Sequence, residues 1–542
     1  MRREAATAWP DSGIAKAEGG TRSRTFQTRP MMNIVINCGV RRALLGIEAS
    51  VALAAAALAP VSGTAQTADS QAAESSSSAD SAAPSEVRIA EIASARRSAD
   101  IAALEAFRPA YPFWQHIYSI PDGSVAFGSG TDGRLLVVFP ATGDWTQTGR
   151  WEEPALASLL DGQALPRDLA QRRERVAEIL GSAAGPVVHH PTRGRFLLPN
   201  VARYSGFLNE WATIYERFGV PAEIGLAQAI VESGLSATAR SKARAIGFCQ
   251  WLQTNWRRLS RLSPHVIEAQ NQTTQAPYCA AYLAILATKY GSFVPALSEH
   301  HAGGTNVGRM LINGERLGGT DVVSRYLLGS QFALAARALP EHNFRELYGT
   351  YGPRSFRYTE LVFGNAATVA HLRATHRQSR IFAMRTSRSI SLGEVMRRTG
   401  LSAAEVRRYN PSLVRRVPAR ATLYLPRRVA TFGRDVSFWQ RPPSRVFTAA
   451  LAAFTALDAT PNEWEEPGFV RVLRTHQRRF ERTRTEEGGI MAVMLAYVID
   501  EIQAGRRGAI LKEYRTSERI GRLFEQAVRQ TNAAPPPADD AR

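Results

Sequence analysis

The chain has 542 residues, which is too long for one compact domain and suits two to four of them. Hydrophobic residues make up 44% and aromatic residues 8%, so the composition excludes a wholly disordered or collagen-like protein. Three cysteines are too few for a disulfide scaffold or a four-cysteine zinc site. The formal charge of +19 predicts an anionic partner, such as nucleic acid, a membrane surface or an acidic polymer.

The first 65 residues have the order of an export signal. A pair of arginines precedes an apolar, alanine-rich run over residues 43–59, and Gly63 and Ala65 are the small residues expected before a cleavage site. The alternative is an uncleaved membrane anchor, but Glu48 interrupts a run that is already short for a span. We therefore expect residues 1–65 to be an export signal and the protein to be periplasmic, associated with the cell envelope.

The next two regions carry no visible chemistry. Residues 66–105 include a Ser- and Ala-rich tract and are predicted to be a flexible linker. Residues 106–195 begin as a predicted β-meander with short strands at 116–120, 124–127 and 134–139, because Pro-Asp-Gly and Thr-Asp-Gly turn signals separate these runs. A helical pattern follows, so this is a small β-rich and helical region whose role the sequence leaves open.

A predicted helix over residues 221–231 ends at Glu232. Pro221 suits the first position of this helix and Gly234 suits its termination. Apolar burial and the negative end of the helix dipole both disfavour a charged carboxylate. We therefore expect a raised pKa for Glu232, which would let it hold a proton as a general acid must. The alternative is an ordinary solvated glutamate.

The residues after Glu232 carry a spaced motif. It consists of Ser233, Ser241, Ala245, Gly247 and Gln250. The motif resembles the signature of family 1 lytic transglycosylases, the SLT domain of glycoside hydrolase family 23, and the chain is similar to the membrane-bound type D kind. Cys249 replaces the usual Met, and His300-His301 stand where the family has Tyr-Asn before Ala-Gly.

The resemblance implies a helical, lysozyme-like catalytic domain over residues 196–347, acting on peptidoglycan without a metal or other cofactor. It implies cleavage of the MurNAc–GlcNAc β-1,4 bond to a 1,6-anhydro-MurNAc end, with Glu232 as acid and then base. The substrate-binding positions that it implies are Ser233, Ser241, Gly247, Gln250, His301 and Tyr326.

The carboxylates of this segment agree with a mechanism that uses one of them. No aspartate lies between Asp168 and Asp321, and Glu232 is the glutamate in a Gly- and Ser-rich turn. Glu299 is the rival second carboxylate, and a second one would change the stereochemical course. The alternatives are a non-catalytic peptidoglycan-binding scaffold and a hydrolytic muramidase.

Other residues near the motif have plainer interpretations. An oxidising compartment permits a disulfide between Cys249 and Cys279, but the sequence leaves their distance open. The adjacent histidines lack the spacing of a metal site. Four aromatic residues at helical spacing are predicted to serve mainly in packing: Trp251, Trp256, Tyr278 and Tyr282.

The positive charge is concentrated in residues 373–428, which contain fourteen arginines and two acids. Capping boxes predict two short helices at 392–398 and 403–408, between strands at 381–385 and 422–425. This βααβ order resembles a LysM domain, which implies a glycan-binding module over residues 378–428. The expected partners are peptidoglycan strands and anionic envelope polymers, and the export signal argues against nucleic acid.

The C-terminal region, residues 430–530, has a helical pattern. Ile490, Met494, Val498 and Ile502 share one face, which predicts packing in a core. Residues 531–542 are predicted to be a disordered tail. The fold class expected for the whole chain is mainly α.

Overall fold

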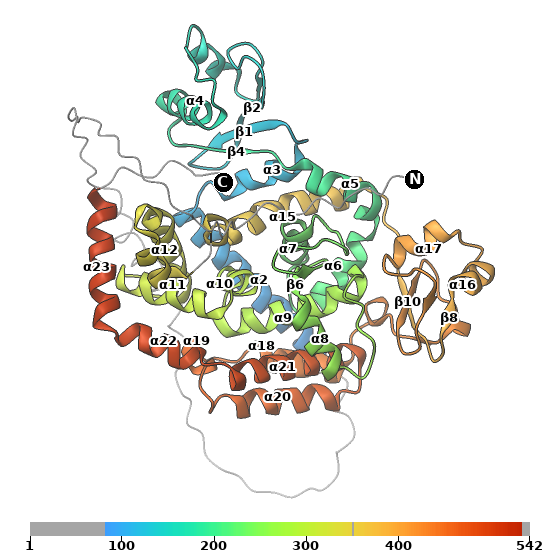
Figure 1. The fold of residues 1–542 in the computed structure, drawn as a ribbon. Helices are drawn as coiled ribbons and strands as arrows, with labels where there is room; N and C mark the ends of the chain where they lie inside the picture. Colours follow the sequence, from blue (N-terminus) through green and yellow to red (C-terminus); the bar gives the residue numbers. More distant parts are fainter. Residues whose placement is uncertain (1–81, 350–351, 534–542) are drawn as a thin grey trace, which may run out of the picture. The chain divides into compact units, whose positions relative to one another are not determined.

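The computed structural model describes residues 82–349 and 352–533, and the predicted export signal lies outside them. The described residues are mostly helical with a few small sheets, so the mainly-α fold class is confirmed (Figure 1). The N-terminal elements are α2 (Ala82–Phe107), η1 (Tyr111–Trp114), α3 (Gln115–Ser119), β1 (Ser124–Ser129), β2 (Leu135–Pro140), β3 (Arg150–Trp151), η2 (Pro154–Leu160), α4 (Leu169–Ala184) and β4 (Val187–Pro191).

Helix α2 occupies most of the predicted linker, so that prediction is wrong for residues 82–105. Leu104 and Asp100 are fully buried, and α2 packs against helices α10, α12 and α18, which are defined below. The Asp100 carboxylate accepts hydrogen bonds from the Ser292 hydroxyl and the Phe293 amide at the start of α10. These tertiary contacts stabilise a helix that composition alone did not indicate.

The N-terminal sheet is antiparallel with the strand order β3-β2-β1-β4. Val125 of β1 lies opposite Phe139 of β2, and Phe139 stacks on Trp145 in a core of its own. The strand expected at 116–120 is wrong, because those residues form α3. This helix continues directly from η1 and buries Ile117 and Tyr118.

The central helices surround α7, which is buried over almost its whole length. Gly225 of α7 allows close packing of α6, because a Cβ there would lie 2.1 Å from the Tyr215 ring. The elements are α5 (Gly194–Tyr204), η3 (Ser205–Phe207), α6 (Leu208–Arg217), α7 (Ala222–Ser233), β5 (Ala245–Ile246), β6 (Trp251–Leu252), α8 (Gln253–Leu262), α9 (Gln272–Tyr290), α10 (Phe293–Ala302), α11 (Gly304–Arg316), α12 (Val322–Ala335), η4 (Ala336–Ala338), α13 (Glu341–Tyr348), α14 (Pro353–Phe356) and α15 (Tyr358–Thr375).

Helix α15 extends the helical domain beyond the boundary expected at residue 347. It packs along α7, and Tyr358 at its first turn is fully buried (Figure 1). The boundary was missed because α15 is buried on most sides and shows little amphipathic periodicity.

The arginine-rich module contains the two expected strands and two expected helices in order, and it adds a short strand before and after the helices. It has a core of its own. Ser402 and Glu405 form the expected capping box. The other expected box is incomplete: the Ser391 side chain accepts from the Glu394 amide, but the Glu394 carboxylate binds Arg388 and not the Ser391 amide. The elements are β7 (Phe382–Arg385), β8 (Ile390–Ser391), α16 (Leu392–Thr399), α17 (Ala403–Tyr409), β9 (Arg416–Val417), β10 (Thr422–Leu425), η5 (Ala430–Phe432), β11 (Arg434–Asp435) and η6 (Phe438–Gln440). Sheets form in the order β10-β7-β11 and between β8 and β9.

The C-terminal region is helical, as predicted, and packs on the central helices. Its elements are α18 (Arg445–Thr455), α19 (Pro461–Trp464), α20 (Val470–Arg482), α21 (Glu486–Ala504), α22 (Arg507–Thr516) and α23 (Glu518–Ala533). Met494 is buried and Val498 packs against the same core, so the predicted packing face of α21 is confirmed. Helix α23 runs into the predicted tail as far as Ala533. Within the described residues no single helix is long and apolar enough to cross a membrane. Helices α21 and α22 meet the length and composition requirement only when taken together, and they are bent by 50° relative to each other.

Candidate active site

Helix α7 delivers Glu232 to the interior of the central domain. The chain turns at Gly234, whose φ of +55° lies in the left-handed region and whose missing Cβ leaves room for the Phe196 carbonyl. The Glu232 side chain is 9% exposed. A buried carboxylate at a helix end agrees with the sequence expectation for its position.

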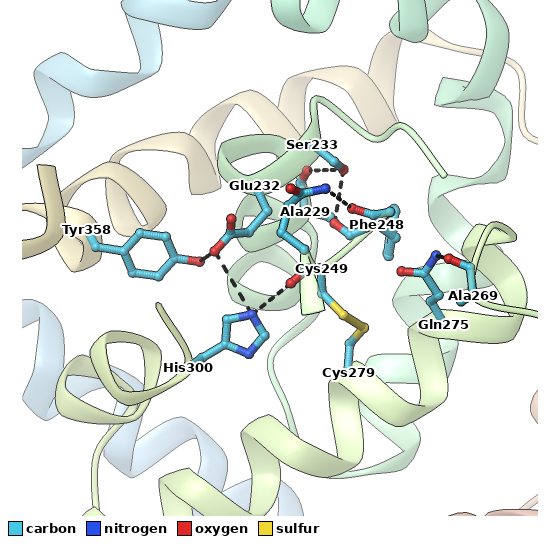
Figure 2. The surroundings of a disulfide bond; sticks show 12 residues. Ala229, Glu232, Ser233, Phe248, Cys249, Ala269, Gln275, Cys279, His300 and Tyr358 are labelled. Carbon is cyan, nitrogen blue, oxygen red and sulfur yellow. Dashed lines mark hydrogen bonds and ion pairs between the residues drawn. A yellow bond between two sulfur atoms is a disulfide. The ribbon is translucent and has the colours of Figure 1, made fainter. Parts of the chain in front are cut away.

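Three side chains converge on the Glu232 carboxylate. The Tyr358 hydroxyl donates a hydrogen bond of 2.6 Å to Oε1. His301 Nδ1 lies 3.5 Å from the same oxygen and His300 Nε2 lies 4.0 Å from it (Figure 2 shows Tyr358 and His300). The His301 and Tyr358 rings are stacked with centroids 4.3 Å apart. The site therefore combines helices α7, α10 and α15.

The pKa of Glu232 is lowered, contrary to the sequence expectation. Burial acts to raise it, but the hydrogen bond and charge of His301, the charge of His300 and the Tyr358 hydroxyl together outweigh burial. Burial and the helix dipole can be inferred from the sequence of α7 alone, whereas the side chains that approach from α10 and α15 cannot. The carboxylate of the free protein is thus stabilised in its charged form.

His300 links Glu232 to the loop that follows the motif. Its Nε2 lies 2.9 Å from the Cys249 carbonyl oxygen, and because a carbonyl only accepts, this nitrogen carries the hydrogen. Burial lowers the pKa of His300. Figure 2 shows this contact beside the disulfide between Cys249 and Cys279, the pairing that the sequence left open.

Gln250 and Gly247 shape this loop. Gln250 has a φ of +49° and its amide group donates to the Gly247 and Ala239 carbonyls, at 3.0 and 3.1 Å. Both amide hydrogens are thus used within the loop, and the substrate-binding role implied for Gln250 stays a prediction. Gly247 has a φ of +80°, and a Cβ at this position would lie only 2.1 Å from the Gln275 amide nitrogen.

The two motif serines also bind backbone. The Ser233 hydroxyl lies 3.1 Å from the Ala229 carbonyl and 3.0 Å from the Phe248 carbonyl, which ties the end of α7 to the loop (Figure 2). Ser241 accepts from the Ala245 amide at 3.0 Å within its own turn. Both hydroxyls therefore stabilise local turns, and the substrate-binding role implied for these serines stays a prediction.

Tyr326, which the resemblance suggested, does not supply the tyrosine at Glu232. It is buried in α12, where burial raises its pKa and the Ser298 and Thr359 hydroxyls partly offset that effect. Tyr358 takes the position at the carboxylate. Its role could not be predicted from the sequence, because Tyr358 lies 126 residues from Glu232 and outside every recognised motif.

Glu299, the rival carboxylate, is committed to a buried ionic cluster. It binds Lys289 at 3.0 Å and Arg507 at 2.6 Å, and both cations also contact Glu465. Burial opposes its charge, but Lys289, Arg507 and the Tyr290 hydroxyl hold the pKa of Glu299 at about 2. Glu299 therefore connects α10 to α22 through its ion pair with Arg507.

The motif aromatics are packing residues, as expected. Trp251 and Trp256 are almost fully buried, with ring centroids 5.2 Å apart. Trp251 also contacts Tyr282 and Tyr497 of α21. In the described part of the chain, no group of three His, Cys, Asp or Glu side chains is arranged to hold a metal ion.

Residues 210–318 match the family model of the transglycosylase SLT domain. The match includes Glu232, His300 and His301 and covers about a fifth of the chain. This part of the chain is a lysozyme-like SLT domain, whose family consists of transglycosylases that act on peptidoglycan. No curated protein matches the chain.

Proposed function

We propose that the protein is an exported lytic transglycosylase that cleaves the MurNAc–GlcNAc β-1,4 bond of peptidoglycan and leaves a 1,6-anhydro-MurNAc end. The observation that carries the proposal is the position of Glu232, a buried carboxylate at the end of α7 within the SLT match. The ionic engagement of Glu299 supports a mechanism with one carboxylate.

The proposed reaction has two proton transfers through Glu232. Its carboxylic acid gives a proton to the glycosidic oxygen while the bond from this oxygen to C1 of MurNAc breaks. The C6 hydroxyl then attacks C1, and the Glu232 carboxylate accepts the hydroxyl proton. The acid is regenerated and no water is consumed.

The remaining regions are proposed to bring this site to the cell wall. The +12 charge of residues 373–428 and their βααβ order support a LysM-like glycan-binding module. The order of residues 1–65 supports export to the periplasm, since charged, apolar and small residues occur in sequence. A fusion of residues 1–65 to a reporter tests export, and a reporter confined to the cytosol would contradict it.

Product mass tests the reaction. Purified sacculi are digested with the protein and the soluble muropeptides are measured by mass spectrometry. The proposal predicts anhydro products, each lighter by one water than the hydrolytic product. Reducing ends would indicate a muramidase, and sacculus binding without release would indicate a scaffold.

A further inference from the structure

His301 and Glu232 form a pair of ionisable side chains in the candidate site. His301 occupies the position at which the resemblance places an asparagine, which cannot titrate. Its Nδ1 lies 3.5 Å from Glu232 Oε1, within ion-pair distance. His301 thus places an ionisable imidazole beside the carboxylate, where an asparagine would be neutral at every pH.

The surroundings of His301 hold the imidazole in place and connect it to solvent. Its ring stacks on Tyr358, with 7° between the ring planes, and its Nε2 lies 3.2 Å from the Ser355 hydroxyl. The His301 side chain is 23% exposed, whereas Glu232 and His300 are nearly buried. Protons from solvent can therefore reach His301 more readily than they reach Glu232.

We propose that His301 is the electrostatic partner of Glu232, whose imidazolium stabilises the carboxylate formed as Glu232 gives its proton to the leaving oxygen. His301 acts through Glu232 and is a positioning residue. The proposal rests on the proposed function, and it adds a requirement for a second proton: the acid step is fastest when Glu232 is a carboxylic acid and His301 is an imidazolium.

Most charged groups on the helices around this pair are engaged by partners of their own. Tyr358 and His300 face the carboxylate directly, and His300 donates to Cys249. Ion pairs engage Glu299 of α10 with Lys289 and Arg507, and on neighbouring helices Glu360 with Arg108 and Arg325 with Glu315. Asp100 of α2 is hydrogen-bonded to the uncharged Ser292, and burial raises its pKa to about 7. Of the two histidines at the carboxylate, His301 lies closer than His300 and is the larger influence on Glu232.

The first test is the pH dependence of kcat/KM for muropeptide release, measured for the full chain and for His301→Asn. We expect the variant to be slower in acid, by about tenfold, because an opposite charge at this distance contributes at least one pKa unit of interaction. The rates should converge at high pH, where histidine is neutral. The pH above which activity falls should move upward in the variant, since the cation that favours the carboxylate is gone.

Control variants separate this role from a structural one. His342→Asn changes an exposed histidine of α13 and should leave the profile unchanged. A loss for His301→Asn that is equal at every pH would overturn the proposal, because it would mean that His301 only holds the fold or the sugar. Equal activity of variant and wild type at every pH would overturn it too.

A second test does not depend on catalysis. The imidazole signals of His301 are followed by NMR as a function of pH in the wild-type chain and in Glu232→Gln. We expect the imidazole signals at a given pH to differ between the two chains, since the carboxylate 3.5 Å from Nδ1 has been removed. Unchanged signals would disprove the coupling, whereas failure to release muropeptides would contradict only the proposed function.

Discussion

Tyr358 donates a 2.6 Å hydrogen bond to Glu232 across 126 residues of sequence. The tyrosine begins α15, which packs along α7 and lies beyond the matched segment 210–318. The hydrogen bond stabilises the charged carboxylate, and the stacked His301 ring holds the tyrosine in place. The candidate site is therefore completed by a helix outside the region in which its motif was found.

Removing this hydroxyl should alter both the rate and its pH dependence. In Tyr358→Phe the carboxylate formed during the acid step loses a hydrogen bond, so kcat should fall by about tenfold. The pKa of Glu232 should rise, because one of the groups that lower it is absent. The falling limb of the pH profile should accordingly move to higher pH. An unchanged pH profile would show that Tyr358 does not influence the protonation of Glu232.

The disulfide offers a test of stability. Cys249 and Cys279 are separated by 30 residues, and a loop of this length predicts a stabilisation of about 3 to 4 kcal/mol. Replacing both cysteines with serine should lower the free energy of unfolding in urea by that order. A reducing agent should destabilise the wild type but leave the double variant unchanged. Equal unfolding curves with and without reductant would contradict a stabilising bond.

The local features of the site could be predicted from sequence, whereas the contacts between distant helices could not. The position of Glu232 at a helix end follows from Pro221, the apolar run and Gly234. The βααβ order follows from capping residues such as Ser402. By contrast, the burial of α2 and the approach of Tyr358 depend on tertiary packing, which local propensity does not encode. The predicted direction of the Glu232 pKa shift was wrong for the same reason.

The buried cluster around Glu299 should govern stability in acid. Its folded pKa of about 2 lies below the ordinary value of 4.5. Stability from its charge is therefore complete above about pH 5 and is lost as the pH falls through 4.5 toward 2. Urea unfolding across this window should show a decline in wild type that is reduced in Glu299→Gln. A decline of the same size in both would contradict the assignment.

Two adjacent arginines, Arg507 and Arg506, test whether the cluster around Glu299 stabilises α22. Arg507→Met leaves Glu299 and Glu465 with one cation fewer in a buried place, so the free energy of unfolding should fall by about 3 to 5 kcal/mol. The neighbouring Arg506 is exposed, so Arg506→Gln should change the free energy of unfolding by less than about 0.5 kcal/mol. Equal effects of the two variants would show that the cluster does not anchor α22.

Exposed arginines of the arginine-rich module, residues 373–428, should contribute to wall binding if the proposed glycan-binding role is correct. The variant Arg397→Gln, Arg415→Gln, Arg416→Gln removes three exposed charges and should weaken sacculus binding, most clearly at low salt, because such charges are screened over about 8 Å at physiological ionic strength. The control changes Arg478, Arg479 and Arg482 of α20, which are also exposed. Equal binding by both variants would contradict a specific role of the module.

The most direct test of the account is the product spectrum of Glu232→Gln. Glutamine preserves the shape of the side chain but has no proton to give, so release of anhydro-muropeptides should fall by about 10² to 10⁴-fold while the fold is retained. Sacculi are digested with equal amounts of wild type and variant, and soluble products are quantified by mass spectrometry. We predict anhydro products from the wild type and almost none from the variant. Near-normal release by Glu232→Gln would contradict the assignment of the acid and, with it, the enzymatic proposal.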